Sequence, residues 1–162
     1  MNTITLFENF SRMNSPRSNK PAVEKGKILL VEDDEMVREW ISEVLSRSGY
    51  QVDSAEDGES GWRKLRLPTY LGRGCYDLLI TDNNMPGLTG VELVARLRAV
   101  RSSIPVILAT GSPPHNLEQL DLNAVLQKPF GGNQLIETVR KILGPYESNS
   151  ASSLNLFSNA EN

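Results

Sequence analysis

The chain has 162 residues, with 17 basic and 20 acidic side chains and a formal net charge of −3. This balance argues against the basic surface of a nucleic-acid-binding domain, and a single cysteine excludes an internal disulfide. No apolar run approaches the ~18 residues of a membrane span, and the N-terminus lacks the basic region of a secretory signal, so we expect a cytoplasmic protein with no membrane or nucleic-acid partner.

Composition divides the chain into one domain and two polar ends. Residues 1–25 are rich in Asn, Ser, Arg and Pro, and residues 145–162 are rich in Ser and Asn without periodicity. Both ends are predicted to be flexible, because such segments bury too little apolar surface to fold. The domain is therefore predicted to cover residues 26–144.

Within that domain, short apolar runs alternate with segments of helical periodicity. The first run, residues 27–31, is typical of a buried strand. The helix after it is expected to turn one apolar face toward the core, comprising Val37, Trp40, Ile41, Val44 and Leu45. A weaker strand at 50–55 is followed by a helix at 57–65 and by a loop that includes Pro68.

The second half of the domain repeats this alternation. Strands are predicted at residues 76–81, 105–110 and 124–127. A last helix ends at residues 144–145, and the chain between the fourth and fifth strands leaves room for only a short helix. A helix over 90–101 is expected to bury Leu93, Val94, Leu97 and Val100.

Strands that alternate with helices indicate an α/β fold of βαβ units around a parallel sheet. Near-continuous apolar strands fit a sheet that is covered on both faces, and right-handed crossovers place helices on both sides. In such sheets, functional groups gather outside the carboxyl ends of the strands. A site is therefore predicted at that edge.

Four of the five predicted strands end in groups suited to one phosphate and one metal ion. Glu32 and Asp33 end the first strand, and Asp82, Thr110 and Lys128 end the third, fourth and fifth. Singly, each has a structural explanation, since Asp82 and Thr110 can start turns and Lys128 can be a solvated surface residue. Together, these explanations require independent coincidences at the one edge where sites form.

Carboxylates that converge at one edge repel one another, so one of the three would be forced to protonate without a cation. Oxygen ligands with no nearby His or Cys select Mg²⁺ over zinc. Asp82 is then the natural nucleophile for an aspartyl phosphate, with Mg²⁺ and Lys128 offsetting the charge of the transferring oxygens. The Thr110 hydroxyl would bond to the phosphoryl group only when that group is present, which makes it a switch.

Four segments resemble the signature blocks of the response-regulator receiver domain of two-component signalling, namely ILLVEDDEMVRE, DLLITDNNMPGLTGVEL, PVILATG and LQKPF. They occur in the family's order between residues 27 and 143. The resemblance implies a flavodoxin-like, doubly wound five-stranded parallel sheet of order 2-1-3-4-5 with helices on both faces. In this chain the fourth helix is expected to be shortened.

The resemblance also implies the roles of the acidic residues. Asp82 is the phospho-acceptor, Asp33 and Asp82 bind Mg²⁺ directly, Glu32 acts through water, and the backbone carbonyl of Asn84 is a further ligand. Asn84 also lies where the family tunes the rate of dephosphorylation. The implied phosphoryl donor is phosphohistidine on a sensor histidine kinase or a histidine phosphotransferase.

The remaining roles follow the fourth and fifth strands. Thr110 resembles the switch hydroxyl, Lys128 the phosphate-binding lysine and Ser112 a second rate-tuning position, and the bond from Lys128 to Pro129 is usually cis in the family. Val125 occupies the position where the family often has a Tyr or Phe that moves with the switch hydroxyl. With the short fourth helix, Val125 indicates an altered signalling face.

These features predict a single-domain response regulator, monomeric or dimerising on phosphorylation, with weak autophosphatase activity rather than turnover of a substrate. The residues after the last helix are too few and too polar for a DNA-binding output module. Two alternatives remain, a pseudo-receiver that docks without phosphorylation and an excised receiver of a hybrid histidine kinase. An aspartate-nucleophile phosphatase is disfavoured, because its D-x-D acid is replaced by Asn84.

Overall fold

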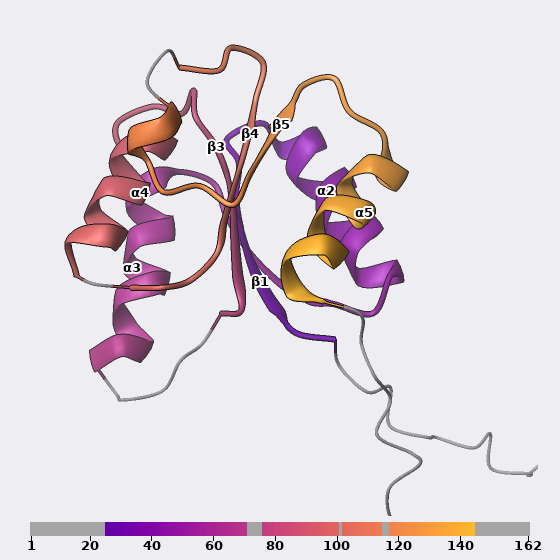
Figure 1. Cartoon of the computed structure of the whole chain (residues 1–162), viewed down its shortest axis with the longest axis horizontal. Coiled ribbons are helices and arrows are strands. Elements are labelled where there is room, and N and C mark those ends of the chain that lie inside the picture. Colours follow the sequence, from indigo (N-terminus) through magenta and orange to yellow (C-terminus); the bar gives the residue numbers. More distant parts are fainter. Residues whose placement is uncertain (1–24, 71–75, 101, 115–116, 145–162) are drawn as a thin grey trace, which may run out of the picture.

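Helices and strands alternate along the chain in the order that the sequence predicts. The structure, a computed structural model, describes residues 25–70, 76–100, 102–114 and 117–144 (Figure 1). The two ends predicted to be flexible lie outside these residues, apart from residue 25. None of the helices in the described ranges has the length and apolar character needed to span a bilayer.

All five strands pair in parallel and form one sheet of order β2-β1-β3-β4-β5, which confirms the predicted fold class. Helices α2 and α5 cover one face of the sheet, and α3 and α4 cover the other (Figure 1). The elements are β1 (Lys27–Val31), α2 (Glu35–Arg47), β2 (Gln51–Ala55), α3 (Gly58–Tyr70), β3 (Leu78–Asp82), α4 (Gly90–Ala99), β4 (Val106–Thr110), β5 (Ala124–Gln127) and α5 (Gly132–Leu143).

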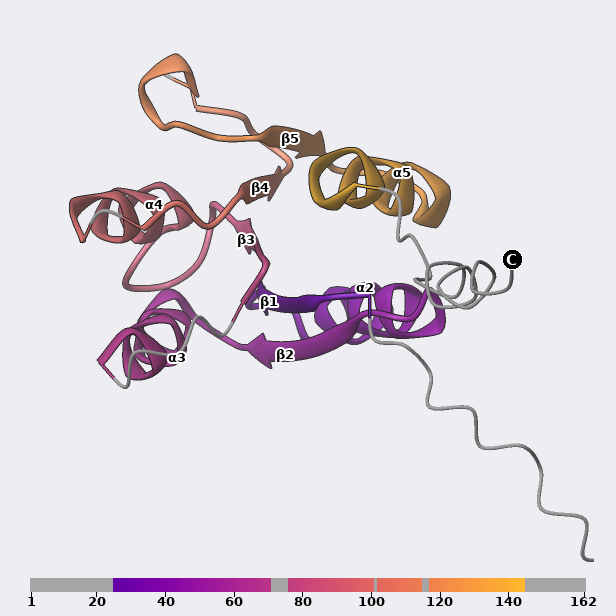
Figure 2. The ribbon, with the colours of Figure 1, turned by 60° about the horizontal axis from the view of Figure 1, so that its bottom comes forward.

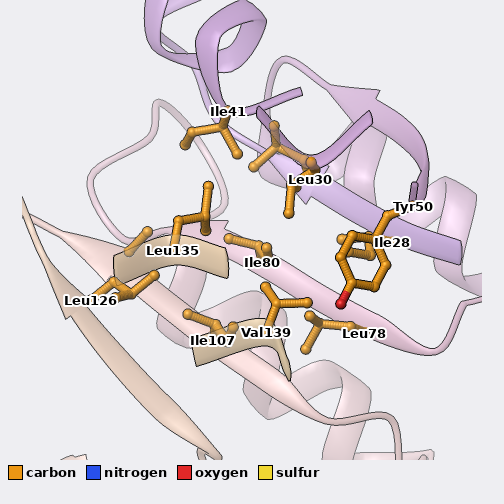
Figure 3. Packing of buried hydrophobic residues seen from close by; sticks show 12 residues of the cluster. Ile28, Leu30, Ile41, Tyr50, Leu78, Ile80, Ile107, Leu126, Leu135 and Val139 are labelled. Atoms are coloured by element: carbon orange, nitrogen blue, oxygen red, sulfur yellow. The ribbon is translucent and has the colours of Figure 1, made fainter. Parts of the chain in front are cut away.

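Two apolar clusters hold the three layers together. Because successive residues of a strand point to opposite faces, Ile28 and Leu30 of β1 pack toward α2 and α5, whereas Leu29 and Val31 pack toward α3 and α4. Figure 3 shows the first of these clusters, in which Leu135 of α5 contacts the sheet. Strands β1, β3 and β4 are buried on both faces, so their apolar runs are nearly continuous.

The parallel register brings the strand ends to one edge of the sheet. Val31 pairs with Thr81, Asp82 with Ala109, and Thr110 with Gln127. The residues that follow β1 therefore emerge beside the end of β3, and those that follow β5 emerge beside the end of β4. This edge is where the sequence predicts a site.

Three predictions of burial or boundary are wrong. Trp40 is 38% exposed and packs against Phe130 at a tilt of 46°, with ring centroids 5.9 Å apart, because it lies at the margin of the apolar face of α2. Val100 is 52% exposed, since α4 ends at Ala99 and Val100 is its C-cap. Pro68 lies inside α3, where its missing N–H removes only a bond of the last turn.

The segment between β4 and β5, where the sequence predicts a shortened fourth helix of the family fold, contains a 3-10 turn, Leu117–Gln119 (Figure 2). Arg98 of α4 joins Asp121, near the end of this segment, to the loop that precedes β4. Its guanidinium donates to the carbonyls of Ser102 and Ile104, both at 2.9 Å, and to that of Asp121 at 2.8 Å. It also forms an ion pair with the Asp121 carboxylate at 3.0 Å. The predicted shortening is thus confirmed and has a structural anchor.

Candidate phosphoryl-transfer site

The turn between β1 and α2 carries two of the predicted acidic residues. Glu32 is 1% exposed and its amide donates to the Ala55 carbonyl, so it continues the line of β1 beside β2. Asp33 is exposed at the rim. Asp34 caps α2 by accepting a hydrogen bond from the Val37 amide at 3.0 Å, which ends the turn.

Asp82 is the last residue of β3 and is 6% exposed. Its Oδ2 accepts a hydrogen bond from the Asn84 amide at 3.2 Å, so the loop after β3 folds back over the carboxylate. Asn83 continues this loop, since its carbonyl accepts from the Gly90 amide and its Oδ1 accepts from the Val91 amide, both at 3.2 Å. The Asp82 side chain is therefore fixed between its own strand and the start of α4.

Lys128 follows β5 and reaches across the sheet edge to both buried acids. Its Nζ lies 2.8 and 2.9 Å from the two oxygens of Glu32 and 3.5 Å from Oδ1 of Asp82. The Lys128 side chain is 24% exposed, so its ammonium remains accessible from the rim. The peptide bond from Lys128 to Pro129 is cis, as predicted.

Three carboxylates meet a single ammonium at this edge. One oxygen each from Glu32, Asp33 and Asp82 lie within 4.8 Å of one another. Burial raises the pKa of the Glu32 carboxyl above its usual 4.5; Asp82 and Asp33 raise it further, and the Lys128 hydrogen bond opposes the rise without cancelling it. Three acids and one lysine leave an excess of negative charge, and the oxygen donors fit a hard divalent cation such as Mg²⁺.

Thr110 ends β4 and is fully buried. Its hydroxyl lies 3.3 Å from both the amide and the carbonyl of Ser112, and its carbonyl accepts from the Lys128 amide at 2.9 Å. Val125 pairs with Leu108, two residues before Thr110, so the Val125 and Thr110 side chains share one face of the sheet. Val125 is 36% exposed on that face.

Sequence reasoning missed two residues that shape this site. Arg38 of α2 donates from Nη1 to the carbonyls of Glu32 and Asp33, at 2.7 and 3.1 Å. Gly90 lies against β3 so closely that an added Cβ would be 2.1 Å from the Asp82 carbonyl oxygen. Neither contact has a signal in the sequence, because each depends on how the start of a helix packs against the end of the strand before it.

Comparison with known proteins gives relatives along most of the domain. Residues 28–140 match the model of the response regulator receiver domain family. The transcriptional regulatory protein CusR of Escherichia coli (strain K12) is 33% identical over 121 residues, which are 72% of this chain and 51% of CusR. The response regulator RppA of Synechocystis is 37% identical over 120 residues, which are 72% of this chain and 50% of RppA.

The match thus spans about half the length of these curated relatives, so the predicted lack of an output module stays untested. Among solved structures, chemotaxis protein CheY4 of Vibrio cholerae has a TM-score of 0.63 at 28% identity, covering 72% of this chain and 97% of CheY4. Response regulator TrrA of Thermotoga maritima, solved with Mg²⁺ and BeF, has a TM-score of 0.62 at 32% identity, with the same coverages. The chain belongs to the response regulator receiver domain family.

Proposed function

We propose that this domain accepts a phosphoryl group from phosphohistidine onto Asp82, in the presence of Mg²⁺. A carboxylate oxygen of Asp82 attacks phosphorus, and the new O–P bond forms as the N–P bond breaks. The electron pair stays on the imidazole nitrogen, which then takes a proton from solvent. The convergence of Glu32, Asp33, Asp82 and Lys128 at one strand edge is the observation that carries this proposal.

The neighbouring side chains would bind either the cation or the phosphoryl group. Asp33 and Asp82 would hold Mg²⁺ directly and Glu32 through water, with the Asn84 carbonyl as a further ligand. The ion would neutralise developing charge on the phosphoryl oxygens. The Lys128 ammonium lies 3.5 Å from Asp82 Oδ1 and would follow the phosphoryl group once charge moves onto it.

Phosphorylation would be sensed by Thr110. Its hydroxyl shares a hydrogen bond with Ser112 at 3.3 Å, and a phosphoryl group on Asp82 would compete for it. If the Thr110 hydroxyl left Ser112 for the phosphoryl group, the loop that begins at residue 111 would shift. With Val125 on β5, this movement would have no aromatic side chain at that position, and Asn84 and Ser112 would tune access of the hydrolytic water.

Receiver domains accept phosphoryl groups from histidine kinases, and a sensor histidine kinase or a histidine phosphotransferase is the partner class we propose for this chain. The signal would leave by protein contact or by relay of the phosphoryl group to another histidine. Weak autodephosphorylation by water would end it. A phosphorylation-dependent homodimer is one form of such contact, and size-exclusion chromatography with and without beryllofluoride tests for it.

Intact-mass measurement after incubation with acetyl phosphate and Mg²⁺ tests the acceptor. The wild type should gain one phosphoryl mass, and Asp82→Asn, which preserves the shape of the side chain, should gain none. Asp77→Asn is the matched control, since Asp77 precedes the same strand at the opposite end, where it accepts from the Lys27 amide. Phosphorylation of Asp82→Asn at the wild-type level would refute the assignment, and an unphosphorylated but folded wild type would favour the pseudo-receiver.

A further inference from the structure

Arg38 contacts the backbone of the acidic turn, residues 32–34, and does not touch the carboxylates of that turn. It lies in the first half of α2, is partly buried, and its Nη1 donates to two consecutive carbonyls, those of Glu32 at 2.7 Å and Asp33 at 3.1 Å. Asp34, the next residue, is fixed by capping α2. Each residue of the turn is therefore tied to the same helix, and Arg38 provides two of the three ties.

The three carboxylates differ in what else holds them. Glu32 is held by two contacts from Lys128, and Asp82 by the Asn84 amide and Lys128. Across the described ranges, neither a side chain nor an amide bonds to the Asp33 carboxylate. Its direction is set by its own backbone, and that backbone is held by Arg38.

We propose that Arg38 is a positioning residue for the metal site, which fixes the backbone of the acidic turn so that the Asp33 carboxylate points at the position of the cation. This inference rests on the proposed Mg²⁺ site. Partners that orient metal ligands without touching the metal change affinity by about 10-fold to 100-fold when they are removed. We therefore expect Arg38→Ala to weaken Mg²⁺ binding by about 10-fold or more.

The surroundings of Arg38 allow its removal without collapse of the turn. Arg38 lines a cavity of about 360 Å³, whose other walls are Ser54, Ala55, Glu56, Ser60 and Lys64. Because one water occupies about 30 Å³ of liquid, several waters fit there, and loss of the Arg38 side chain should let them reach the two carbonyls that lose their donor. The variant should fold with a looser turn, so its affinity can be measured on native protein.

Arg98→Ala is the matched control for the loss of an arginine. Arg98 also donates to backbone carbonyls, those of Ser102, Ile104 and Asp121, but it does so at the opposite end of the fold, after α4. Both variants lose the same kind of hydrogen bonds, so both should unfold at lower temperature. Only Arg38→Ala should also weaken Mg²⁺ binding to the folded protein.

Titration calorimetry with Mg²⁺ on wild type, Arg38→Ala, Arg38→Lys and Arg98→Ala provides the primary test. Arg38→Lys keeps a positive charge and N–H donors on a shorter side chain, and it should bind Mg²⁺ with intermediate affinity. A double-mutant cycle then adds Asp33→Asn: in that background, Arg38→Ala should cause a much smaller further loss than it causes in wild type.

The results distinguish a failure of the Mg²⁺ site from a failure of the positioning role of Arg38. A wild type that binds no Mg²⁺ refutes the metal site itself, whatever the variants do. If the wild type binds and Arg38→Ala binds as tightly as Arg98→Ala, the positioning role is wrong. Fully additive losses in the cycle would also overturn it, because Arg38 would then act independently of Asp33.

Discussion

Replacing Gly90 with alanine should displace the loop that follows Asp82 and slow phosphorylation, although alanine is the better helix former. Gly90 begins α4, and a Cβ there would lie 2.1 Å from the Asp82 carbonyl oxygen and 3.0 Å from the Asn83 Cα. Because non-bonded contacts between heavy atoms are optimal at about 3.5 Å, the helix start and the strand end must separate by about 1.4 Å. Neither side can yield easily.

Helix α4 is anchored by its capping box, in which Thr89 and Glu92 bond to each other's amides, and by the buried Leu93. The displacement should therefore reach Asp82. Overpacking of this kind costs about 1–3 kcal/mol, and the gain in helix propensity from Gly to Ala offsets about 1 kcal/mol of it. Misplacement of a reacting group by about 1 Å can slow a reaction about 100-fold, so the loss of rate should exceed the loss of stability.

The assay is the rate of phosphorylation by acetyl phosphate, with urea unfolding of the same samples. Gly132→Ala is the control, since Gly132 also begins a helix, α5, and its added Cβ would meet only Val44 side-chain atoms at 3.4 and 3.6 Å. Gly132→Ala should keep the wild-type rate. A Gly90→Ala protein that is phosphorylated as fast as Gly132→Ala would refute the steric reasoning.

Three further predictions concern stability. Asp57 precedes α3 and caps it by accepting a hydrogen bond from the Ser60 amide at 2.6 Å, which holds the pKa of the Asp57 carboxyl below 3.8. The charge-dependent part of this stabilisation is therefore present at neutral pH and is lost as pH falls through that lowered pKa. Urea unfolding of Asp57→Ala should show a loss of about 1 kcal/mol at neutral pH, and Asp57→Asn should keep the cap without its pH dependence. Arg98→Ala should lower the free energy of unfolding by about 1–3 kcal/mol, because two part-buried carbonyls, those of Ser102 and Ile104, lose their donor. An unchanged denaturation midpoint would contradict its role as an anchor. Mg²⁺ at about 100 times its Kd should raise the free energy of unfolding by about 2.7 kcal/mol, which thermal melting can measure. EDTA should reverse this stabilisation, and the same Mg²⁺ concentration should stabilise Asp33→Asn less.

The fold and the acidic cluster were predictable for the same physical reason. Strands such as β1 and β3 are buried on both faces, so their sequences are apolar runs that end just before Glu32 and just before Thr81 and Asp82. In a parallel sheet the ends of such runs share one edge. Lys128, distant in sequence, could be assigned to that edge by the same reasoning, and its contacts with Glu32 confirm the placement.

Errors arose at the margin of a helix face and at the ends of helices, where local periodicity does not determine burial. Trp40 fits the apolar face of α2, yet it lies at the margin of that face against Phe130 and remains partly exposed. Val100 continues the pattern of α4 beyond the residue where the helix ends. Arg38 and Gly90 escaped notice because a guanidinium on two backbone carbonyls and a missing Cβ leave no pattern in the sequence.

The ion pair between Lys128 and Glu32 joins residues 96 positions apart, and this separation links the site to the order of folding. Lys128 arrives only after β5, a four-residue strand at the sheet edge, has docked on β4. Short edge strands open more readily than central ones, because fewer buried contacts must be broken. Native-state hydrogen exchange should therefore find the amides of β5 opening before those of β1 and β3, and each such opening would withdraw the lysine while the three carboxylates stay together.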